Sequence, residues 1–383
     1  MSEFRLSAAV SRRNILRGLI GTAGLVAAGG SLAACGGSAA SSAAGTIGAN
    51  LEEIIKLAKQ EGRVQLIACP ESWANYKGHF QAFKAKYGVD TPVDSPDASS
   101  AEELQAVKNS KGQSSQPDVI DVGYSFTQPA VDKGLIEAYK PTTFEQTPAE
   151  LRDSNGMWVG AYYGVLSIGV NTNNVEMPRS FKDLLDPKYK GKIALPGDPR
   201  KGATSMATVF AATLANGGSL DDVTAGIEFF ARLAKSGNLV SVTSVASALS
   251  TGQASVLFDW NYNFLGIEEE MKRSGVALQT AILPDGVFGN YYAQPVTIQS
   301  PRPNAARLWI EWLNSDEGAE QFALGGAVPA RYAQLKKDGK LSQQALSKLP
   351  PADVLAGIRF PSIEQGAKAG KTITDQWSQK VGA

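Results

Sequence analysis

The sequence predicts an α/β fold built from two domains. Segments with helical periodicity alternate with short apolar segments typical of buried strands, which is the pattern of parallel sheets covered by helices. The chain of 383 residues is long for a single hydrophobic core. Residues 158–175, WVGAYYGVLSIGVNTNNV, form one long β-rich run with little helical character. That run is long enough to cross between two domains.

The first third of the folded part alternates helices and strands. Ser100 and Glu103, spaced three residues apart, predict a capping box at the start of one helix. Gly62 predicts the end of the first helix. The expected elements are a helix at 51–62, a strand at 63–69, a loop at 70–76, a helix carrying His79, a strand at 89–95 broken by Pro92, a helix at 99–112 and a buried strand at 118–125.

After the long β-rich run, helices and strands resume in the same alternating manner. An amphipathic helix is expected to stop at Gly237. The expected segments are 180–193, a strand-like stretch at 193–199, helices at 203–218 and 221–237, a buried strand at 255–261, a helix at 262–275, a strand at 291–299, a pair of helices at 304–324 and C-terminal helices within 331–383.

The N-terminus has the features of an export signal. Arg12 and Arg13 form a twin-arginine pair ahead of a weakly apolar, Gly- and Ala-rich stretch at 16–34, which resembles a Tat signal, with Sec export the alternative. Leu32-Ala33-Ala34-Cys35 resembles a bacterial lipobox, which implies that the thiol of Cys35 is lipidated; the alternative is an ordinary signal peptide with a chance cysteine. Residues 1–35 are therefore expected to be a signal, and residues 36–50 a flexible tether.

Composition excludes several classes of function. The formal net charge is zero and no basic stripe occurs, which argues against nucleic acid as a partner. With Cys35 lipidated, Cys69 is the one remaining cysteine, so no internal disulfide is expected. His79 is the only histidine, and a solvated or packed helix position suits it better than catalysis. Common catalytic motifs such as Gly-x-Ser-x-Gly are missing, which weakens an enzyme interpretation.

Residues 181–193, FKDLLDPKYKGKI, resemble the W-x-D-L-L-D-P-K-Y-K-G-K-I segment of extracellular solute-binding proteins of ABC importers, with Phe181 in place of the Trp. The similarity extends over the chain from about residue 51 and is greatest with binders of ferric iron, polyamines, thiamine and aminophosphonates. The companion segments are Val170-Asn171-Thr172-Asn173, Asp198-Pro199 with Gly202, Thr204 and Ser205, Gly252-Gln253-Ala254, Asn304-Ala305-Ala306, and Trp309-Ile310-Glu311-Trp312-Leu313-Asn314.

The resemblance implies a two-lobed periplasmic-binding-protein-like fold with hinge strands between the lobes and a ligand cleft between them. Lobe one is expected at 51–165 and 293–330 and lobe two at 166–292, with 331–383 assigned to neither. The implied protein is not an enzyme, needs no cofactor or metal and is a monomer. It is anchored outside the cytoplasmic membrane through Cys35 and delivers a small ligand to an ABC permease.

The loop at 197–205 precedes a helix and is a candidate anion site. It has glycines at Walker spacing, but Ala203 stands where a nucleotide loop needs lysine, so a P-loop is rejected. What remains is a helix N-terminus with hydroxyls and cations, which suits a carboxylate, phosphonate or phosphate, or else a plain helix cap with solvated charges. The candidate residues here are Arg200, Lys201, Thr204 and Ser205.

Asp259 and Trp260 end a buried strand and are candidates for an ammonium group, through charge and a cation–π face. Ferric binders carry a Tyr-Tyr pair about here, so Trp260-Asn261 argues against iron, and Tyr291-Tyr292 is expected to form an aromatic wall of the cleft. Packing in the core is the competing role for each aromatic. The remaining candidates are Ser72, Trp73, Tyr76, Tyr124 and Ser125 at the rim of lobe one and, more weakly, Arg331.

The predicted function is capture of a small amine or zwitterion, such as an amino acid-like compound, an aminophosphonate or a polyamine. A ferric-iron binder of the same fold is the first alternative. An exported α/β hydrolase is less favoured, because a nucleophile would need a base and His79 offers little.

Overall fold

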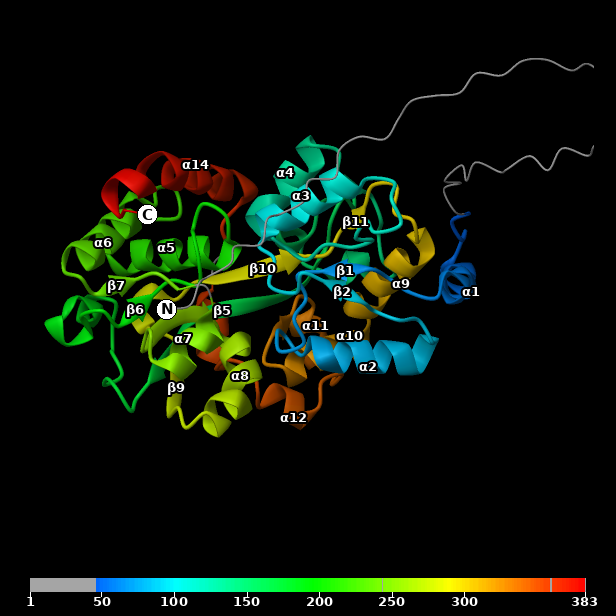
Figure 1. The fold of residues 1–383 in the computed structure, drawn as a ribbon. Coiled ribbons are helices and arrows are strands. Elements are labelled where there is room, and N and C mark those ends of the chain that lie inside the picture. The colour runs from blue at the N-terminus through cyan, green and yellow to red at the C-terminus, as the bar shows by residue number, and fades with distance from the viewer. Residues whose placement is uncertain (1–45, 243, 359, 383) are drawn as a thin grey trace, which may run out of the picture. The chain divides into compact units, whose positions relative to one another are not determined.

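The computed structural model describes residues 46–242, 244–358 and 360–382, which form two lobes joined by two strands (Figure 1). The joining strands are β5, Gly160–Asn171, and β10, Gly289–Ala293. They pair antiparallel, with Tyr163 opposite Tyr291. The two-lobed α/β fold expected from the sequence is confirmed. Residues 1–35, including Cys35, and most of the predicted tether lie outside the described residues.

One eight-stranded sheet runs through both lobes in the order β3-β10-β5-β8-β6-β7, and β9 and β12 pair with β5 as well. The first half of β5 pairs with β10 and β12, whereas its second half pairs with β8 and β9. The other strands of this sheet are β3 Val122–Gly123, β6 Ile193–Ala194, β7 Leu239–Val240, β8 Val256–Trp260, β9 Leu278–Ala281 and β12 Val328–Pro329. The predicted lobe boundaries at 165/166 and 292/293 fall inside β5 and β10 and remain a proposal.

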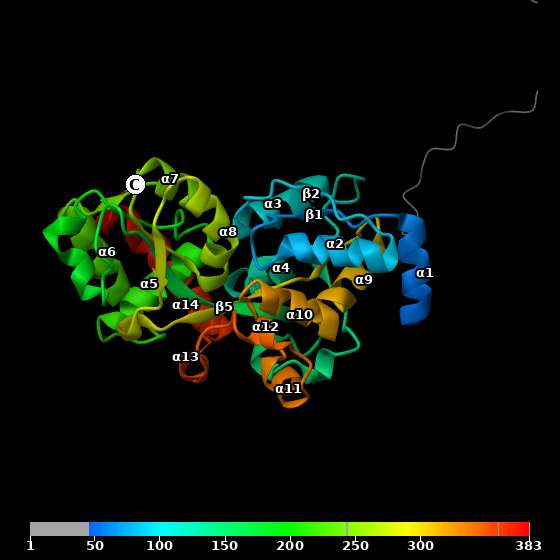
Figure 2. The same cartoon turned by 90° about the horizontal axis from the view of Figure 1, so that it is seen from below.

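Lobe one also holds two small sheets, and its helices surround them (Figure 2). The sheets are β1 Leu66–Ile67 with β2 Val93–Asp94, parallel, and β4 Ile136–Glu137 with β11 Val296–Thr297, antiparallel. The helices are α1 Leu51–Glu61, α2 Tyr76–Tyr87, α3 Ser100–Ser110, α4 Thr127–Asp132, α9 Pro303–Asn314, α10 Asp316–Leu324, α11 Tyr332–Lys337 and α12 Gln343–Leu346. Gly62 ends α1 at φ 74°, as predicted.

Lobe two packs its helices on the sheet that continues from β5. Its helices are α5 Ala203–Ala215, α6 Thr224–Lys235, α7 Val245–Thr251 and α8 Asn261–Arg273. The C-terminal segment adds α13, Ala352–Gly357, and α14, Ile363–Lys380. Trp377 of α14 packs against Phe230 of α6, with ring centroids 5.7 Å apart. The chain after β12 therefore begins beside α10 with α11 and α12 and ends on lobe two.

Six short 3-10 helices fill connections in the described part of the chain. They are Tyr124–Phe126, Phe144–Gln146, Ala149–Leu151, Lys182–Leu185, Pro187–Tyr189 and Pro284–Gly286. Two of them lie in the segment 180–193 that resembles the family motif. Pro187 breaks that segment, because proline lacks an N–H and cannot continue a helix.

The capping box of α3 lies one residue earlier than predicted. Glu102 accepts a hydrogen bond from the backbone N–H of Ser99 at 2.8 Å, so the pair is Ser99 and Glu102. Glu103 is buried and accepts the backbone N–H of Asp121 at 2.7 Å instead. The carboxylate that local spacing predicted for the cap therefore forms a long-range hydrogen bond instead.

His79 is buried in the core of lobe one. Its Nδ1 accepts the indole N–H of Trp312 at 3.2 Å, and its ring lies 4.1 Å from that of Phe322. Burial lowers the pKa of His79 to about 3, so the ring is neutral. Within the described ranges, no helix is both long and apolar enough to cross a membrane.

Candidate ligand-binding site

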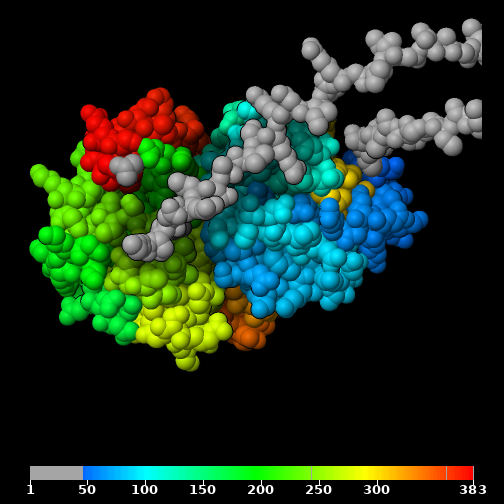
Figure 3. Space-filling model, in the orientation of Figure 1, coloured from blue at the N-terminus to red at the C-terminus, as the bar shows by residue number. Residues whose placement is uncertain are grey.

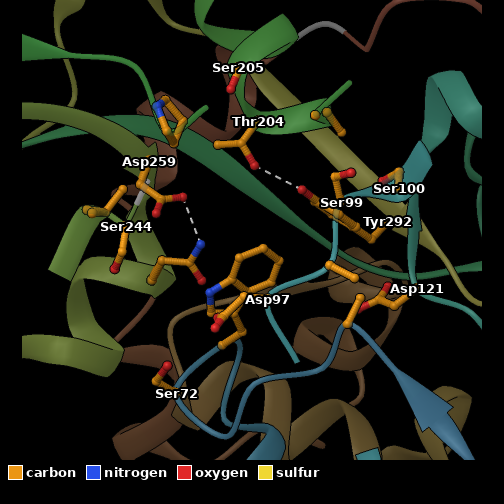
Figure 4. A pocket seen from close by; sticks show the side chains of 18 of the residues that line it. Ser72, Asp97, Ser99, Ser100, Asp121, Thr204, Ser205, Ser244, Asp259 and Tyr292 are labelled. Carbon is orange, nitrogen blue, oxygen red and sulfur yellow. Dashed lines mark hydrogen bonds between the residues drawn. The ribbon is translucent and has the colours of Figure 1, made fainter. Parts of the chain in front are cut away.

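A cavity of about 260 Å³ lies where the two lobes meet (Figure 4). Figure 3 shows the two lobes side by side, lobe one mostly in blue and cyan and lobe two mostly in green and yellow. Lobe one contributes the loop after β1, the start of α3 and Asp121. Lobe two contributes the first turns of α5 and α7 together with Asp259 and α8, and Tyr292 comes from β10. Drug-sized ligands occupy sites of roughly 300–1,000 Å³, so this cavity suits a smaller molecule.

Close backbone packing brings α8 against the loop of lobe one. A Cβ atom at Gly266 would lie 1.9 Å from the carbonyl oxygen of Ser72, so only glycine permits this approach. Similarly, a Cβ atom at Gly123 would lie 2.2 Å from the Cβ of Ala203, at the start of α5. These small residues let the two lobes close around the cavity.

Carboxyl groups are the charged groups of the cavity. Among the described residues that line it, none is Lys, Arg or His. Asp97 is exposed at the rim, whereas the other three carboxyl residues are buried. The four carboxyl residues in the lining are Asp97, Glu103, Asp121 and Asp259. A site with this lining favours a positively charged group on its ligand.

Asp259 is placed by the end of β8, two residues before α8 begins. Its Oδ1 accepts hydrogen bonds from the backbone N–H of Trp260 and from Nδ2 of Asn263, both at 2.7 Å (Figure 4). Burial raises its pKa to about 7, although these two hydrogen bonds oppose the shift. An ammonium group in the cavity would restore the charge of this carboxylate.

Asp121 lies on the opposite side of the cavity, just before β3. Its Oδ2 accepts the hydroxyls of Tyr76 at 2.7 Å and Tyr162 at 2.9 Å, and its Oδ1 accepts Nε2 of Gln294. Burial raises the pKa of Asp121 to about 6, against the effect of these donors. The pKa of Glu103 is raised well above its usual range by burial and then by the nearby charge of Asp121.

The N-terminus of α5 faces the cavity without a side-chain cap, because Gly202 stands at the N-cap position. Thr204 Oγ1 lies 3.0 Å from the hydroxyl of Tyr292 and accepts the indole N–H of Trp260 at 3.0 Å. The hydroxyl of Ser205 is buried and has no hydrogen-bond partner among the residues that the structure describes (Figure 4). Backbone N–H groups at a helix start bind negatively charged or hydrogen-bond-accepting groups.

Six of the residues that the sequence nominated line the cavity, and the structure brings them together from four parts of the chain. Trp73 and Tyr292 form an edge-to-face aromatic pair with ring centroids 6.4 Å apart. The six are Ser72, Trp73, Thr204, Ser205, Asp259 and Tyr292. Their roles in binding remain predictions.

The other nominated residues do not line this cavity in the described structure. Trp260 is fully buried behind Thr204 and Tyr292, so its ring does not line the cavity. Tyr76 is also behind the surface, bonded to Asp121. Arg200 pairs with Asp198 at 2.7 Å, and Lys201 beside it is exposed.

Tyr291 lies on the opposite face of β10 from Tyr292, because adjacent residues of a strand point to opposite sides. It stacks on Trp158 at 5.6 Å and contacts Tyr124, the first residue of the 3-10 turn that also holds Ser125. Arg331 is buried elsewhere in lobe one, bonded to Gln146 and Asp316. None of these four residues reaches the described cavity.

Sequence reasoning missed part of the lining. One sequence feature could have identified Asp121 as a site residue: it is a charged residue inside the apolar stretch DVIDVGYS, which was predicted to be a buried strand. Asn263 carried one as well, four residues after Asp259 and therefore on the same side of a helix start. The missed polar residues are Asp97, Ser99, Ser100, Glu103, Asp121, Ser244 and Asn263.

The alternative functions depend on Tyr291-Tyr292 and on His79, whose positions the structure describes. Tyr291 and Tyr292 point apart, so they do not share a ligand as an adjacent iron-binding pair would. In the part of the chain that the structure describes, no three His, Cys, Asp or Glu side chains are grouped to hold a metal ion. His79, the base that a hydrolase would need, is buried against Trp312 and does not line the cavity.

A family model of the bacterial extracellular solute-binding proteins matches residues 114–356, more than half of the chain. The chain belongs to this family. A Haemophilus influenzae protein described as uncharacterized is 28% identical over 256 residues, covering 63% of this chain and 69% of that protein. A probable amino-acid ABC transporter periplasmic-binding protein of Sinorhizobium fredii is 29% identical over 163 residues, covering 40% and 37%.

Solved structures of solute-binding proteins share the fold. The fructose-6-phosphate-bound protein AfuA of Actinobacillus pleuropneumoniae has a TM-score of 0.67 at 19% identity, covering 84% of this chain and 99% of that one. Iron-bound HitA of Pseudomonas aeruginosa has a TM-score of 0.62 at 18% identity, covering 84% and 99%. The chain is thus a solute-binding protein of ABC transport, from a family that works outside the cytoplasm, and these neighbours bind chemically different ligands.

Proposed function

We propose that this solute-binding protein captures a small amine or zwitterion between its lobes and delivers it to an ABC permease. The observation that carries the proposal is the lining of the cavity, in which carboxyl groups are the only charged groups among the described residues. Lysine or arginine in the lining would serve a phosphate or sugar phosphate, and neither occurs there. An ammonium group is the ligand chemistry that matches buried carboxyl groups whose pKa burial has raised.

The ammonium group is placed at Asp259. Its carboxylate lies in the cavity wall, in a site where water is largely excluded and charge attraction is strong. A carboxylate or another accepting group of the same ligand would lie at the uncapped start of α5, where Ser205 has an unpartnered hydroxyl. This arrangement supports an amino acid-like ligand, and one relative is described as a probable amino-acid binding protein.

The proposal includes the membrane anchor. Arg12, Arg13 and the lipobox that ends at Cys35 support Tat export and lipidation of Cys35, which would hold a monomeric protein at the outer face of the cytoplasmic membrane. Fractionation of cells with wild-type protein and with Cys35→Ala tests this. Release of the variant from the membrane supports the anchor, and equal membrane retention of both proteins contradicts it.

Identification of the co-purified ligand tests the binding function. The protein is purified without refolding, native mass spectrometry measures the mass of any bound molecule, and denaturation releases it for identification. Thermal-shift measurements with amines, amino acids, phosphonates and ferric salts follow on ligand-free protein. A bound amine or zwitterion supports the proposal. Stoichiometric iron, or stabilisation by phosphates or phosphonates lacking an amine, contradicts it.

A further inference from the structure

Asn263 presents a buried acceptor atom at the cavity. It lies in the first turn of α8, four residues after Asp259, and is 4% exposed. Its Nδ2 donates to Asp259 Oδ1 at 2.7 Å. When Asp259 is ionised, this contact fixes the orientation of the amide, because a carboxylate accepts from N–H and cannot accept from a carbonyl oxygen. The Oδ1 of Asn263 is left buried with no hydrogen-bond partner in the described structure.

Asp259 likewise has one oxygen that takes part in neither of its two hydrogen bonds. Both hydrogen bonds that it accepts end on Oδ1, from Trp260 N and from Asn263 Nδ2. Its second oxygen and the Oδ1 of Asn263 are thus two acceptors carried by neighbouring groups that both line the cavity. A buried acceptor without a donor is energetically costly, so the pair suits a ligand that brings donors.

We propose that Asn263 and Asp259 together accept hydrogen bonds from the N–H groups of the ligand's ammonium, and that they select primary or secondary amines over quaternary ammonium compounds. The inference rests on the proposed function, since it concerns the same site. Asn263 is then a specificity-determining residue.

The physical basis is the number of donors on the nitrogen. A protonated primary amine has three N–H groups and satisfies both acceptors, whereas a trimethylammonium group has none and leaves Asn263 unsatisfied. Aromatic faces, which attract either kind of cation, are few in this lining, where Trp73 and Tyr292 are the aromatic residues. Hydrogen bonds to charged groups then predict a preference of about 10- to 100-fold for the N–H-bearing compound.

Paired probes that differ in N-methylation test the inference on the full-length protein. Calorimetry or thermal shift compares ethanolamine with choline, glycine with glycine betaine, and 1,4-diaminobutane with its hexamethylated form. The variant is Asn263→Leu, which keeps the approximate shape and removes the acceptor. Asn263→Asp keeps acceptors at this position, and Asn155→Leu, on an exposed loop, is the matched control.

We expect the wild type to prefer the unmethylated partner of whichever pair binds, Asn263→Leu to reduce that preference about tenfold, and Asn263→Asp and Asn155→Leu to retain it. The ratio of the two affinities separates recognition from a general folding defect, which would weaken both partners alike. Should Asn263→Leu not fold, Asn263→Ala takes its place, since it also removes the acceptor and is expected to reduce the preference in the same way.

Equal binding of methylated and unmethylated partners overturns the inference and leaves the proposed function standing. An undiminished preference in Asn263→Leu also overturns it, because the selection would then be steric. Absence of binding by every amine at millimolar concentration overturns the proposed function together with the inference.

Discussion

Asp121 and Asp259 are both buried carboxyl residues at the same cavity, one in each lobe, yet their surroundings differ. Asp121 accepts three side-chain donors, from Tyr76, Tyr162 and Gln294, which occupy both of its oxygens. Asp259 accepts two donors on one oxygen. Burial raises the pKa of Asp259 to about 7 and that of Asp121 to about 6, since Asp121 has more donors to oppose the shift.

This difference in hydrogen bonding distinguishes Asp121, as a structural carboxylate, from Asp259, as a candidate for ligand binding. Asp121 joins α2, β5 and the segment after β10 through its donors, so its main effect is on the stability of lobe one. Asp259 retains the capacity to accept hydrogen bonds from a ligand. Burial and charge alone would have ranked the two residues together, and the count of satisfied acceptors distinguishes them.

The largest expected effect comes from Asp121→Ala. The substitution leaves the hydroxyls of Tyr76 and Tyr162 and the amide of Gln294 without their acceptor, and each unsatisfied buried donor costs about 1–3 kcal/mol. We expect the free energy of unfolding to fall by about 3 kcal/mol or more. Urea unfolding of the ligand-free protein measures it.

Asp121→Asn is the control for that experiment, because it keeps an acceptor oxygen while removing the charge. We expect it to lose less stability than Asp121→Ala. A loss of under about 1 kcal/mol in Asp121→Ala would contradict a structural role for this residue.

The second effect is that of Asp259→Asn on binding. Removal of the charge should weaken binding of an amine about 100-fold, since truncating a buried charge partner costs about 2–5 kcal/mol. The unfolding temperature of the ligand-free protein should stay the same or rise, because a carboxyl group that burial disfavours is removed. Calorimetry and thermal unfolding measure the two quantities, and wild-type affinity in the variant would show that Asp259 does not bind the amine.

The third effect is the pH dependence of amine affinity. Asp259 must be ionised to pair with an ammonium group, so affinity should be highest above pH 7 and fall about tenfold for each unit below it. Asp121, with a pKa of about 6, and Glu103, whose pKa is also raised, should steepen the loss at lower pH. Calorimetry from pH 5 to 8 measures this, and Asp259→Asn should be flatter above pH 6.

The stability of the ligand-free protein should respond to pH with the opposite sign. The folded pKa of Asp259 is above its unfolded value, so this residue contributes most stability at low pH and loses that contribution as pH rises toward 7. A bound amine should remove the effect. A ligand affinity that does not change between pH 5 and 8 would contradict the pairing of Asp259 with the amine. Urea unfolding of the ligand-free wild type and of Asp259→Asn at pH 5 and 7 measures the stability, and the same change with pH in both proteins would contradict this contribution of Asp259.

The smallest effect is expected from Ser205→Ala. The hydroxyl adds one hydrogen bond at the start of α5, so its loss should weaken an amine that carries a carboxylate about 3- to 10-fold. The methyl ester or decarboxylated form of the same amine should be affected less. Calorimetry with each pair measures the difference, with Ser154→Ala on an exposed loop as the control. Equal losses for both compounds would place the anionic group elsewhere.

The sequence predicted the elements correctly where short-range features alone determine them. Gly62 ends α1, and the alternation of segments predicted the α/β class, whereas the two lobes were implied by the family resemblance. The prediction was wrong where a contact with a distant segment determines the role of a residue. Glu103 had the spacing of a capping residue, but the backbone N–H of Asp121 takes its carboxylate and the cap moves to Ser99 and Glu102.

The candidate site shows the same limit. The pair Tyr291-Tyr292 gave no indication of which tyrosine faces the cavity, because a strand sends adjacent residues to opposite sides and the sheet pairing sets the choice. Asp198 neutralises the neighbouring Arg200, so the cation predicted for an anion site is paired within its own loop. Asp97 and Ser99 reach the cavity only because lobe one closes against lobe two.

The sequence by itself determined the class of fold through its alternating segments and indicated the family through the resemblance of residues 181–193. It also nominated Asp259, Thr204 and Ser205, because strand ends and helix starts are local features that spacing encodes. The tertiary structure decided which side chains meet. The lining without basic residues and the fully bonded state of Asp121 arise from contacts between segments far apart in the chain. The oxygen of Asn263 stays unpartnered because none of the described residues brings a donor to it. Hydrogen-bond satisfaction is a property of such contacts, so only the folded chain shows which acceptors remain for a ligand.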